Sequence, residues 1–248
     1  PVSRSRDFHR RRPETARDRG RAEAFADRLV REIAMVAPLF DRDRDVVQLH
    51  LGEDALPFLQ PSLLAELMES LSRQFHFTSS SARDFSIGID PGSVEPAAIE
   101  ALAGLGFNRA CLELQELDPA ASTVTDQAQI AEAARATIHA CRQHRFRTVA
   151  VDLSCGVPGQ TLAGFEHTLD IVVECLPDQV AIAAAKLKPP VPSLRAPTTE
   201  ASACITTSRA ELLALAVDKL TTAGYCHLGL YRFVRPGDVL NIARQAGH

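Results

Sequence analysis

The chain has 248 residues, of which 46% are hydrophobic and 23% are charged. This composition supports a folded domain with a real core and excludes a disordered tail. The formal net charge of −4 argues against a nucleic-acid-binding protein. No apolar run reaches the roughly 18 residues of a spanning helix, and no signal peptide is visible, so we expect a cytoplasmic protein without a membrane segment.

The N-terminus has a composition of its own, with eight arginines and four acids in the first 24 residues. We interpret residues 1–21 as a basic N-terminal segment that is either solvated or an arm for a phosphate-rich partner. A helix over 22–36 is expected to follow. Residues 22–248 are expected to form one barrel domain.

The rest of the chain alternates predicted strands with predicted helices. Ser208 and Glu211 form a capping box before the last helix, which Gly224 ends, and Thr161 can cap the helix that follows it. The proline-rich passage over 186–206 is predicted to be a loop. Strands are predicted over 46–52, 85–90, 109–115, 148–153, 180–184 and 228–233, and helices over 61–75, 95–105, 126–144, 162–173 and 208–223.

Strands separated by helices indicate an α/β fold with parallel pairing and right-handed crossovers. A closed or part-open (β/α) barrel is favoured, and a doubly wound sheet is the alternative. In either fold, ligands bind where strands end and loops begin. Asp152 is expected at such a strand end, where it could bind a ribose or an amine or cap the following turn.

Several local motifs are weak on their own. The glycine-rich segment Gly156–Thr161 lacks the lysine of a P-loop and is better explained as a tight turn between a strand and a helix. Glu53 and Asp54 are adjacent acids, which could serve acid–base or metal roles but are usually solvated. His50 is expected to be a strand histidine that faces a neighbour.

The six cysteines show no metal-binding spacing. No CxxC or CxxxCxxC pattern occurs anywhere in the chain, so a local zinc or iron–sulfur site has no support. We expect reduced, partly buried thiols and no metal site.

Eight segments of the chain can be compared as an ordered set: Ala37–Phe40, Val47–His50, Ser86–Pro91, Gly106–Arg109, Asp152–Thr161, Pro177–Asp178, Ala223–Tyr225 and Phe233–Asp238. Read together, these segments resemble oxygen-independent coproporphyrinogen III dehydrogenase (HemN) and its relatives in the radical S-adenosylmethionine (SAM) superfamily. They occur in the order of that family and cover roughly residues 22–247. The resemblance implies a partial (β/α) barrel of the radical SAM type whose first strand is absent or degenerate.

The resemblance also implies a vestigial SAM pocket. Gly52, Gln115 and Asp152 match family positions that contact SAM. The other positions of that pocket depart from the family. The family's cysteine motif corresponds to residues 1–12, which hold no cysteine, and its GGGTP segment reads Gly52–Pro57. Further departures are Gly88 for a glutamate, Ala184–Leu187 for NYAH, Gln127 for an arginine and Tyr231-Arg232 for Asp-His.

Three thiolates hold the [4Fe–4S] cluster that reduces SAM in this family, so no cluster is expected in this chain. The leading hypothesis is a HemN-related pseudoenzyme, non-catalytic or regulatory, with no catalytic residue and no predicted cofactor, in porphyrin or heme metabolism. It would bind a small anionic ligand or a tetrapyrrole, or act as a partner subunit, because a missing first strand leaves a sheet edge unpaired. One alternative is a genuine dehydrogenase whose cluster cysteines lie upstream, and another is a protein that binds SAM without a radical.

Overall fold

The computed structural model describes residues 16–52, 55–114, 124–157, 160–184, 208–229 and 231–247. It contains two compact units: unit 1 comprises Pro1–Glu113 and Ala136–Val149, and unit 2 comprises Leu114–Arg135 and Ala150–His248. The predicted loop over 186–206, the paired acids Glu53 and Asp54, and Gln115 lie outside the described residues. The division into residues 1–21 and 22–248 stays a prediction.

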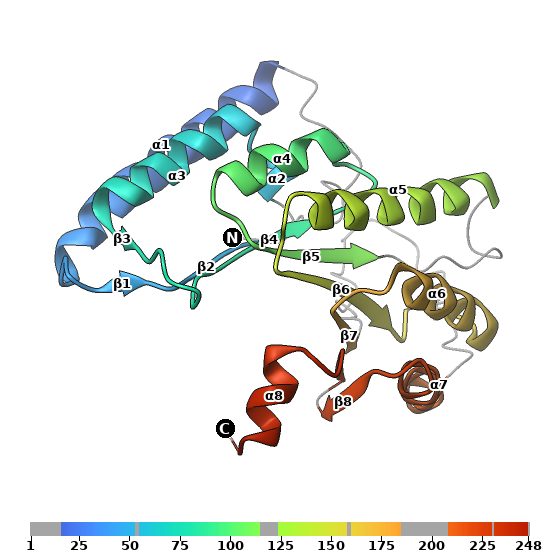
Figure 1. Cartoon of the computed structure of the whole chain (residues 1–248). Helices are drawn as coiled ribbons and strands as arrows, with labels where there is room; N and C mark the ends of the chain where they lie inside the picture. Colours follow the sequence, from blue (N-terminus) through green and yellow to red (C-terminus); the bar gives the residue numbers. More distant parts are fainter. Residues whose placement is uncertain are drawn as a thin grey trace, which may run out of the picture. The chain divides into compact units, whose positions relative to one another are not determined.

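Unit 1 contains a parallel three-stranded arrangement and the helices that precede and link its strands (Figure 1). Its strands lie in the order β2-β4-β5, so β2 ends this arrangement among the described strands, and a separate parallel pair joins β1 to β3. Its elements are α1 (Ala16–Val36), η1 (Ala37–Leu39), β1 (Asp45–Val46), β2 (Gln48–Leu51), α2 (Ala55–Phe58), α3 (Pro61–Gln74), β3 (His76–Phe77), β4 (Asp84–Ile89), α4 (Pro96–Gly104) and β5 (Arg109–Leu114).

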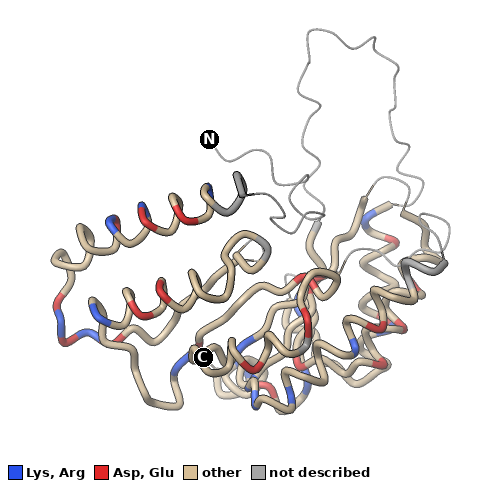
Figure 2. The backbone as a smooth tube through the Cα atoms, turned by 90° about the horizontal axis from the view of Figure 1, so that it is seen from above, with Lys and Arg blue, Asp and Glu red and all other residues tan. Residues whose placement is uncertain are grey.

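The helix pair α1–α3 shows why the apolar spacing of α3 matters. Leu64, Leu67 and Met68 of α3 are buried, as the i, i+3, i+4 pattern requires. The two helices lie side by side, and α1 buries small residues such as Ala22 and Ala26. Basic and acidic residues follow one another along α1 (Figure 2).

The single strand predicted over 46–52 is wrong, because two short strands stand in its place. The backbone carbonyl of Val46 accepts a hydrogen bond from the Thr78 amide after β3, whereas that of Val47 accepts one from the Asp84 amide of β4. The chain therefore changes its pairing partner at Val47. A change of partner leaves the local hydrophobic pattern intact, so the pattern alone does not reveal it.

Unit 2 is a mixed arrangement in the order β6-β7-β9-β8. β6 and β7 are parallel, and β9 runs antiparallel to both β7 and β8. Helices α6 and α7 pack against each other. The elements that lie in this unit or cross into it are α5 (Val124–Gln143), β6 (Thr148–Cys155), α6 (Leu162–Cys175), β7 (Gln179–Ala184), α7 (Arg209–Thr222), β8 (Cys226–Gly229), β9 (Arg232–Val234) and α8 (Val239–Gln245).

The predicted starts of α6 and α7 are confirmed by their N-terminal caps. The Thr161 hydroxyl accepts a hydrogen bond from the Gly164 amide at 3.0 Å, at the start of α6. The predicted capping box of Ser208 and Glu211 is formed in both directions at the start of α7. Gly224 follows α7 with a φ of +89°, a conformation that glycine adopts without steric cost.

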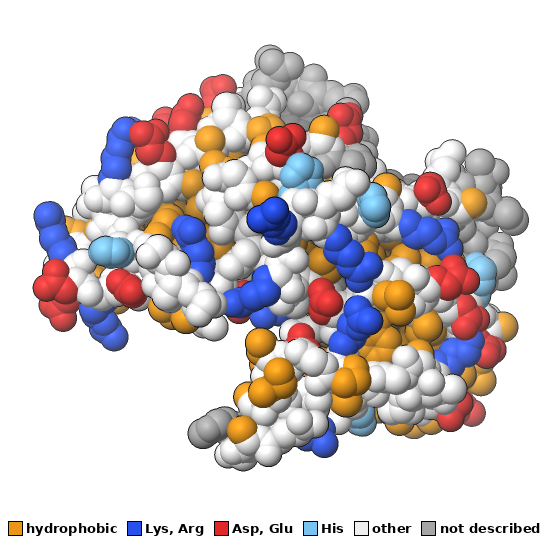
Figure 3. Space-filling view, viewed as in Figure 1, with side chains coloured by type: hydrophobic (Ala, Val, Ile, Leu, Met, Phe, Trp, Pro, Cys, Tyr) orange, Lys and Arg blue, Asp and Glu red, His pale blue; other side chains and the backbone are white. Residues whose placement is uncertain are grey.

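The single strand predicted over 228–233 is also wrong. The chain reverses between β8 and β9, where Gly229 (φ +94°) and Tyr231 (φ +69°) both have left-handed backbone conformations. The α8 helix that follows was not predicted. It buries Asn241 and exposes Val239, Leu240 and Ile242, which are visible as hydrophobic side chains over this helix in Figure 3. Because the apolar residues of α8 are exposed and a polar residue is buried, the sequence lacks the apolar spacing that predicts an amphipathic helix.

Among the described residues, no helix is both long and apolar enough to cross a membrane. The described strands do not close into a barrel, and the parallel pairing of β2, β4 and β5 and of β6 with β7 agrees with the predicted α/β class.

Asn108 joins three segments of unit 1. Its Oδ1 accepts a hydrogen bond from the Phe85 amide at 2.9 Å, and its Nδ2 donates to the Arg83 carbonyl at 2.8 Å. Its backbone carbonyl accepts a hydrogen bond from the Arg147 amide at 2.7 Å. The side chain therefore fixes the start of β4 against the start of β5.

The substitution Asn108→Ala is expected to lower the free energy of unfolding by about 2 kcal/mol, since it leaves two backbone groups without partners. Asn108→Asp keeps the acceptor for the Phe85 amide but places a carboxylate oxygen against the Arg83 carbonyl, so it is expected to cost at least as much. Urea denaturation measures both. Ser72→Ala, which removes an exposed side-chain bond on α3, is the control and should change little. Equal stability of Asn108→Ala and the wild type would contradict this role.

Gly156 follows β6 with a φ of +78°, and a Cβ at this position would lie 2.5 Å from Nε of Arg209. Gly224 has a similar φ but nothing within 4 Å of its would-be Cβ. We expect Gly224→Ala to cost about 1 kcal/mol through the backbone alone, and Gly156→Ala to cost more. Thermal unfolding measures the difference. Truncation of Arg209 in the Gly156→Ala variant should recover only the part of the stability loss that exceeds the loss in Gly224→Ala. Equal stability losses in the two glycine variants would refute the close contact.

Candidate ligand-binding face

Each unit presents strands with one apolar side and one polar side. Along β5, Ala110, Leu112 and Leu114 are buried, whereas Cys111 and Glu113 between them are only partly buried. Successive side chains of a strand point to opposite sides, so the alternation separates two faces. The side that carries the polar residues is here called the polar face of each unit.

The polar face of unit 1 follows from the register of its strands. His50 of β2 is paired with Ser86 of β4, and Gly88 of β4 is paired with Cys111 of β5. On the opposite face, Phe85, Ile87 and Ile89 are fully buried. The polar face of unit 1 is therefore lined by His50, Ser86, Gly88, Arg109, Cys111 and Glu113.

His50 and Ser86 form a hydrogen-bonded pair on this face. The His50 Nδ1 lies 2.8 Å from the Ser86 Oγ, and that hydroxyl donates to the Leu49 carbonyl at 3.3 Å. The tautomer of His50 decides whether the imidazole or the hydroxyl donates in this pair. The prediction that His50 faces a strand neighbour is confirmed.

The polar face of unit 2 carries two opposite charges in one row. Asp152 of β6 is paired with Ala181 of β7, and Ala181 is paired with Arg232 of β9. Ser154 and Ala183 form the next row. The other face is apolar and fully covered, with Val151, Leu153, Val180, Ile182 and Phe233 at 0–2% exposure.

The predicted position of Asp152 at a strand end is wrong. β6 continues to Cys155, so Asp152 lies inside the strand, and its partly buried side chain belongs to the polar face. Two ladder pairs beyond the predicted end of the strand at Leu153, those of Ser154 and Cys155, were unrecognised because Ser154 and Gly156 look like turn residues.

The turn after β6 is held by Gln160, which sequence reasoning missed. Its Oε1 accepts hydrogen bonds from the amides of Gly156 at 2.6 Å and Val157 at 3.2 Å, and its Nε2 donates to the Ser154 carbonyl at 3.2 Å. Gln160 is only 3% exposed. This arrangement uses the turn amides internally and agrees with the predicted tight turn, of which residues 158–159 lie outside the described part.

The three residues predicted to contact SAM are distributed as follows. Gly52 follows β2 in unit 1, is exposed, and has open space around it. Asp152 lies on the polar face of unit 2, and Gln115 is outside the described residues. Gly52 and Asp152 therefore belong to different units.

The described cysteines do not fit a [4Fe–4S] cluster. Cys111, Cys141, Cys155, Cys175 and Cys226 lie on five different elements. No three histidine, cysteine or acidic side chains in the described part of the chain are placed to hold a metal ion. Burial raises the pKa of Cys141 to about 12 and also raises that of Cys155, against the opposing charge of Arg209. Neutral thiols of this kind are poor ligands.

No protein-family model matches the sequence. Curated relatives do. The oxygen-independent coproporphyrinogen III oxidase of Pseudomonas aeruginosa is 31% identical over 233 residues, which cover 93% of this chain and 50% of that protein. The Escherichia coli enzyme is 29% identical over 231 residues, with the same shares of the two chains.

A solved structure agrees with these matches. Coproporphyrinogen III oxidase (HemN) from Escherichia coli, described as a radical SAM enzyme, superposes with a TM-score of 0.78 at 28% identity. The match covers 94% of this chain and 53% of that chain. The chain thus spans about half the length of the relatives it matches, and the predicted resemblance is confirmed. This chain is homologous over that span to the oxygen-independent coproporphyrinogen III oxidases, and it has the fold of the part of HemN that it covers.

Proposed function

We propose that this chain is a HemN-related binding protein of heme biosynthesis that carries no [4Fe–4S] cluster and binds an anionic, tetrapyrrole-type ligand instead of oxidising it by a radical. The observation that carries the proposal is the placement of the cysteines. The cysteines that the structure describes are scattered over five elements, whereas a cluster needs three thiolates within one loop or one small pocket.

Burial of the thiols supports the same proposal. Cys141, Cys155 and Cys175 are buried among apolar residues, where the neutral thiol is favoured over the thiolate. Of the partly buried thiols, Cys111 belongs to unit 1 and Cys226 to unit 2, and a single thiolate does not hold a cubane. The three buried cysteines therefore serve as small core residues.

The relation to the relatives bears on the ligand. Homologues named for coproporphyrinogen III act on a tetrapyrrole that carries carboxylates. This chain shares the fold of about half the length of such a protein. The polar faces of the two units supply hydrogen-bonding groups on strands whose opposite sides are fully packed. A scaffold of this kind can bind a ligand without a redox centre.

The genuine enzyme remains the competing hypothesis, since cluster cysteines could be supplied by residues upstream of Pro1. It differs from the proposal in one respect, the source of three thiolates. SAM binding without a radical is less well supported. Of the residues predicted for it, Asp152 is the one on a described polar face, and the GGGTP segment that would surround the methionyl group is lost.

Anaerobic reconstitution of the 248-residue chain with iron and sulfide tests the proposal. We expect no stoichiometric iron and no charge-transfer absorption after desalting, because no three thiolates converge among the residues that the structure describes. Escherichia coli HemN, treated in parallel, is the positive control. A stable, stoichiometric [4Fe–4S] signal in this chain would refute the cluster-free function.

Binding of coproporphyrin III, the stable oxidised form of the ligand, tests the second half of the proposal. We expect saturable quenching of porphyrin fluorescence that weakens with added salt, since charged groups on a solvated face are screened. Mesoporphyrin, a dicarboxylate of the same ring, should bind more weakly than this tetracarboxylate. Absence of saturable binding would contradict the proposed ligand class.

A further inference from the structure

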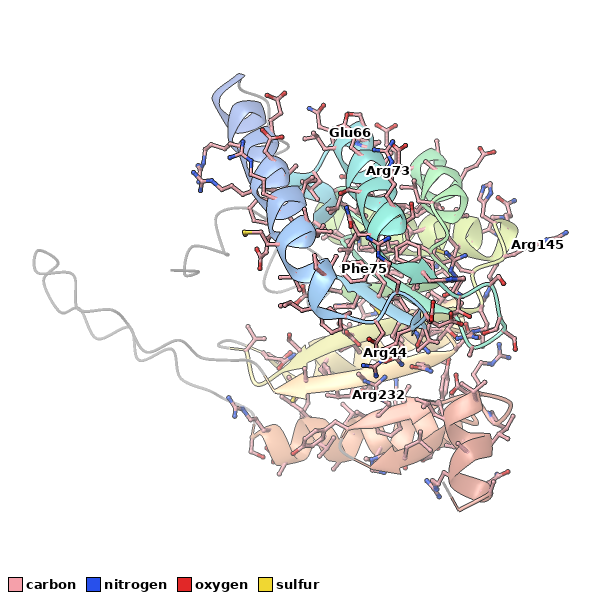
Figure 4. All side chains as sticks on the ribbon, turned by 90° about the vertical axis from the view of Figure 1, so that its left-hand side faces the viewer. Arg44, Glu66, Arg73, Phe75, Arg145 and Arg232 are labelled. Atoms are coloured by element: carbon pink, nitrogen blue, oxygen red, sulfur yellow. The ribbon has the colours of Figure 1, made fainter. Side chains whose placement is uncertain are left out.

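We propose that Arg232 is a carboxylate-binding residue on the polar face of unit 2. This inference rests on the proposed function, because it names the group that would receive the anionic side chain of the ligand. Arg232 lies on β9 and is labelled in Figure 4. It was not singled out as a binding residue by the sequence.

A hydrogen-bond relay through the buried Gln179 holds the Arg232 guanidinium in place. Its Nη1 donates to Oε1 of Gln179 at 3.1 Å, and Nε2 of Gln179 donates to Oδ2 of Asp238 at 2.9 Å. Gln179 is completely buried, and Asp238 is itself fixed because its Oδ1 caps the Leu240 amide at 2.9 Å. One N–H group of the forked Arg232 guanidinium therefore serves to orient the side chain.

The remaining N–H groups of the Arg232 guanidinium form no hydrogen bond within the described part of the chain. Arg232 is an exposed residue, and the one side-chain partner of its guanidinium among the described residues is Gln179. No acidic side chain of the described chain lies within ion-pair distance of it. A guanidinium that is oriented by a neutral amide keeps its full charge for an incoming anion.

The neighbouring residues leave room for a ligand. Ala181 is paired with Arg232, and the exposed Ala183 follows on the same face. Both residues have the smallest side chain that a strand normally carries. Asp152 lies beyond Ala181 in the same row and is the acidic group of this face. A carboxylate next to Arg232 would thus be separated from Asp152 by Ala181.

The position also distinguishes this chain from its family. The resemblance places Tyr231-Arg232 where the family has Asp-His. The substitution replaces a group that titrates near neutral pH with one that stays positive. A permanent positive charge favours an anionic ligand at any physiological pH.

The first test uses propionate, the side-chain acid of coproporphyrin, and needs no tetrapyrrole. Nitrogen-15 spectra of the arginine Nε–H groups should show a saturable shift of the Arg232 resonance, assigned by its loss in Arg232→Lys. The matched control is Arg244, whose Nη1 donates to the His227 carbonyl at 2.6 Å. No shift at Arg232, or an equal shift at both arginines, would overturn the inference.

The second test measures coproporphyrin III binding by variants. Arg232→Ala should weaken binding about tenfold or more, as expected for a lost hydrogen bond to a charged group. Arg232→Lys should lie between Arg232→Ala and the wild type, and Arg244→Ala should bind like the wild type. Thermal unfolding checks that Arg232→Ala is folded, and Arg232→Gln replaces it if it is not.

The outcomes separate the two proposals. A propionate shift at Arg232 without any coproporphyrin binding would retain the carboxylate site and refute the tetrapyrrole ligand. Coproporphyrin binding that is unchanged in the folded Arg232 variants would retain the ligand and overturn the role of Arg232.

Discussion

The structure depends on the two-sided character of its parallel strands. In each unit, one side of the strands is removed from water by apolar packing, with residues such as Ile87 and Val151 completely buried. Burial of this side fixes the register, because a slip of one residue would expose the whole apolar set. The other side is then free to carry polar residues at little cost in stability. Function in this chain is therefore a matter of which residues occupy that second side.

The elements with strong periodicity could be predicted from the sequence. α3 is recognisable from the spacing of Leu64, Leu67 and Met68, and α7 from its capping box and the glycine after it. The two wrongly predicted strands, over 46–52 and 228–233, have a common cause. At Val47 and between β8 and β9, the chain changes its pairing partner or direction, and a tertiary choice of this kind leaves no periodic signal.

The candidate site was only partly predictable for a related reason. Asp152 stands out as a lone acid in an apolar strand, and His50 as a lone imidazole. Gln160 and Gln179 do not stand out, because a glutamine in a sequence gives no indication that it will be buried and will orient its neighbours. Arg232 likewise gains its meaning only from the register that places it beside Ala181.

The position of β2 at the end of the strand order in unit 1 has a consequence for solubility. Among the described strands it pairs on one side only, with β4, so its other backbone edge can accept hydrogen bonds from a further strand. With four residues, Gln48–Leu51, it offers few ladder bonds to an incoming chain, and its exposed Gln48 and His50 interrupt the apolar pattern that amyloid-type stacking requires. The short length and the alternating polarity of β2 thus disfavour edge-to-edge aggregation.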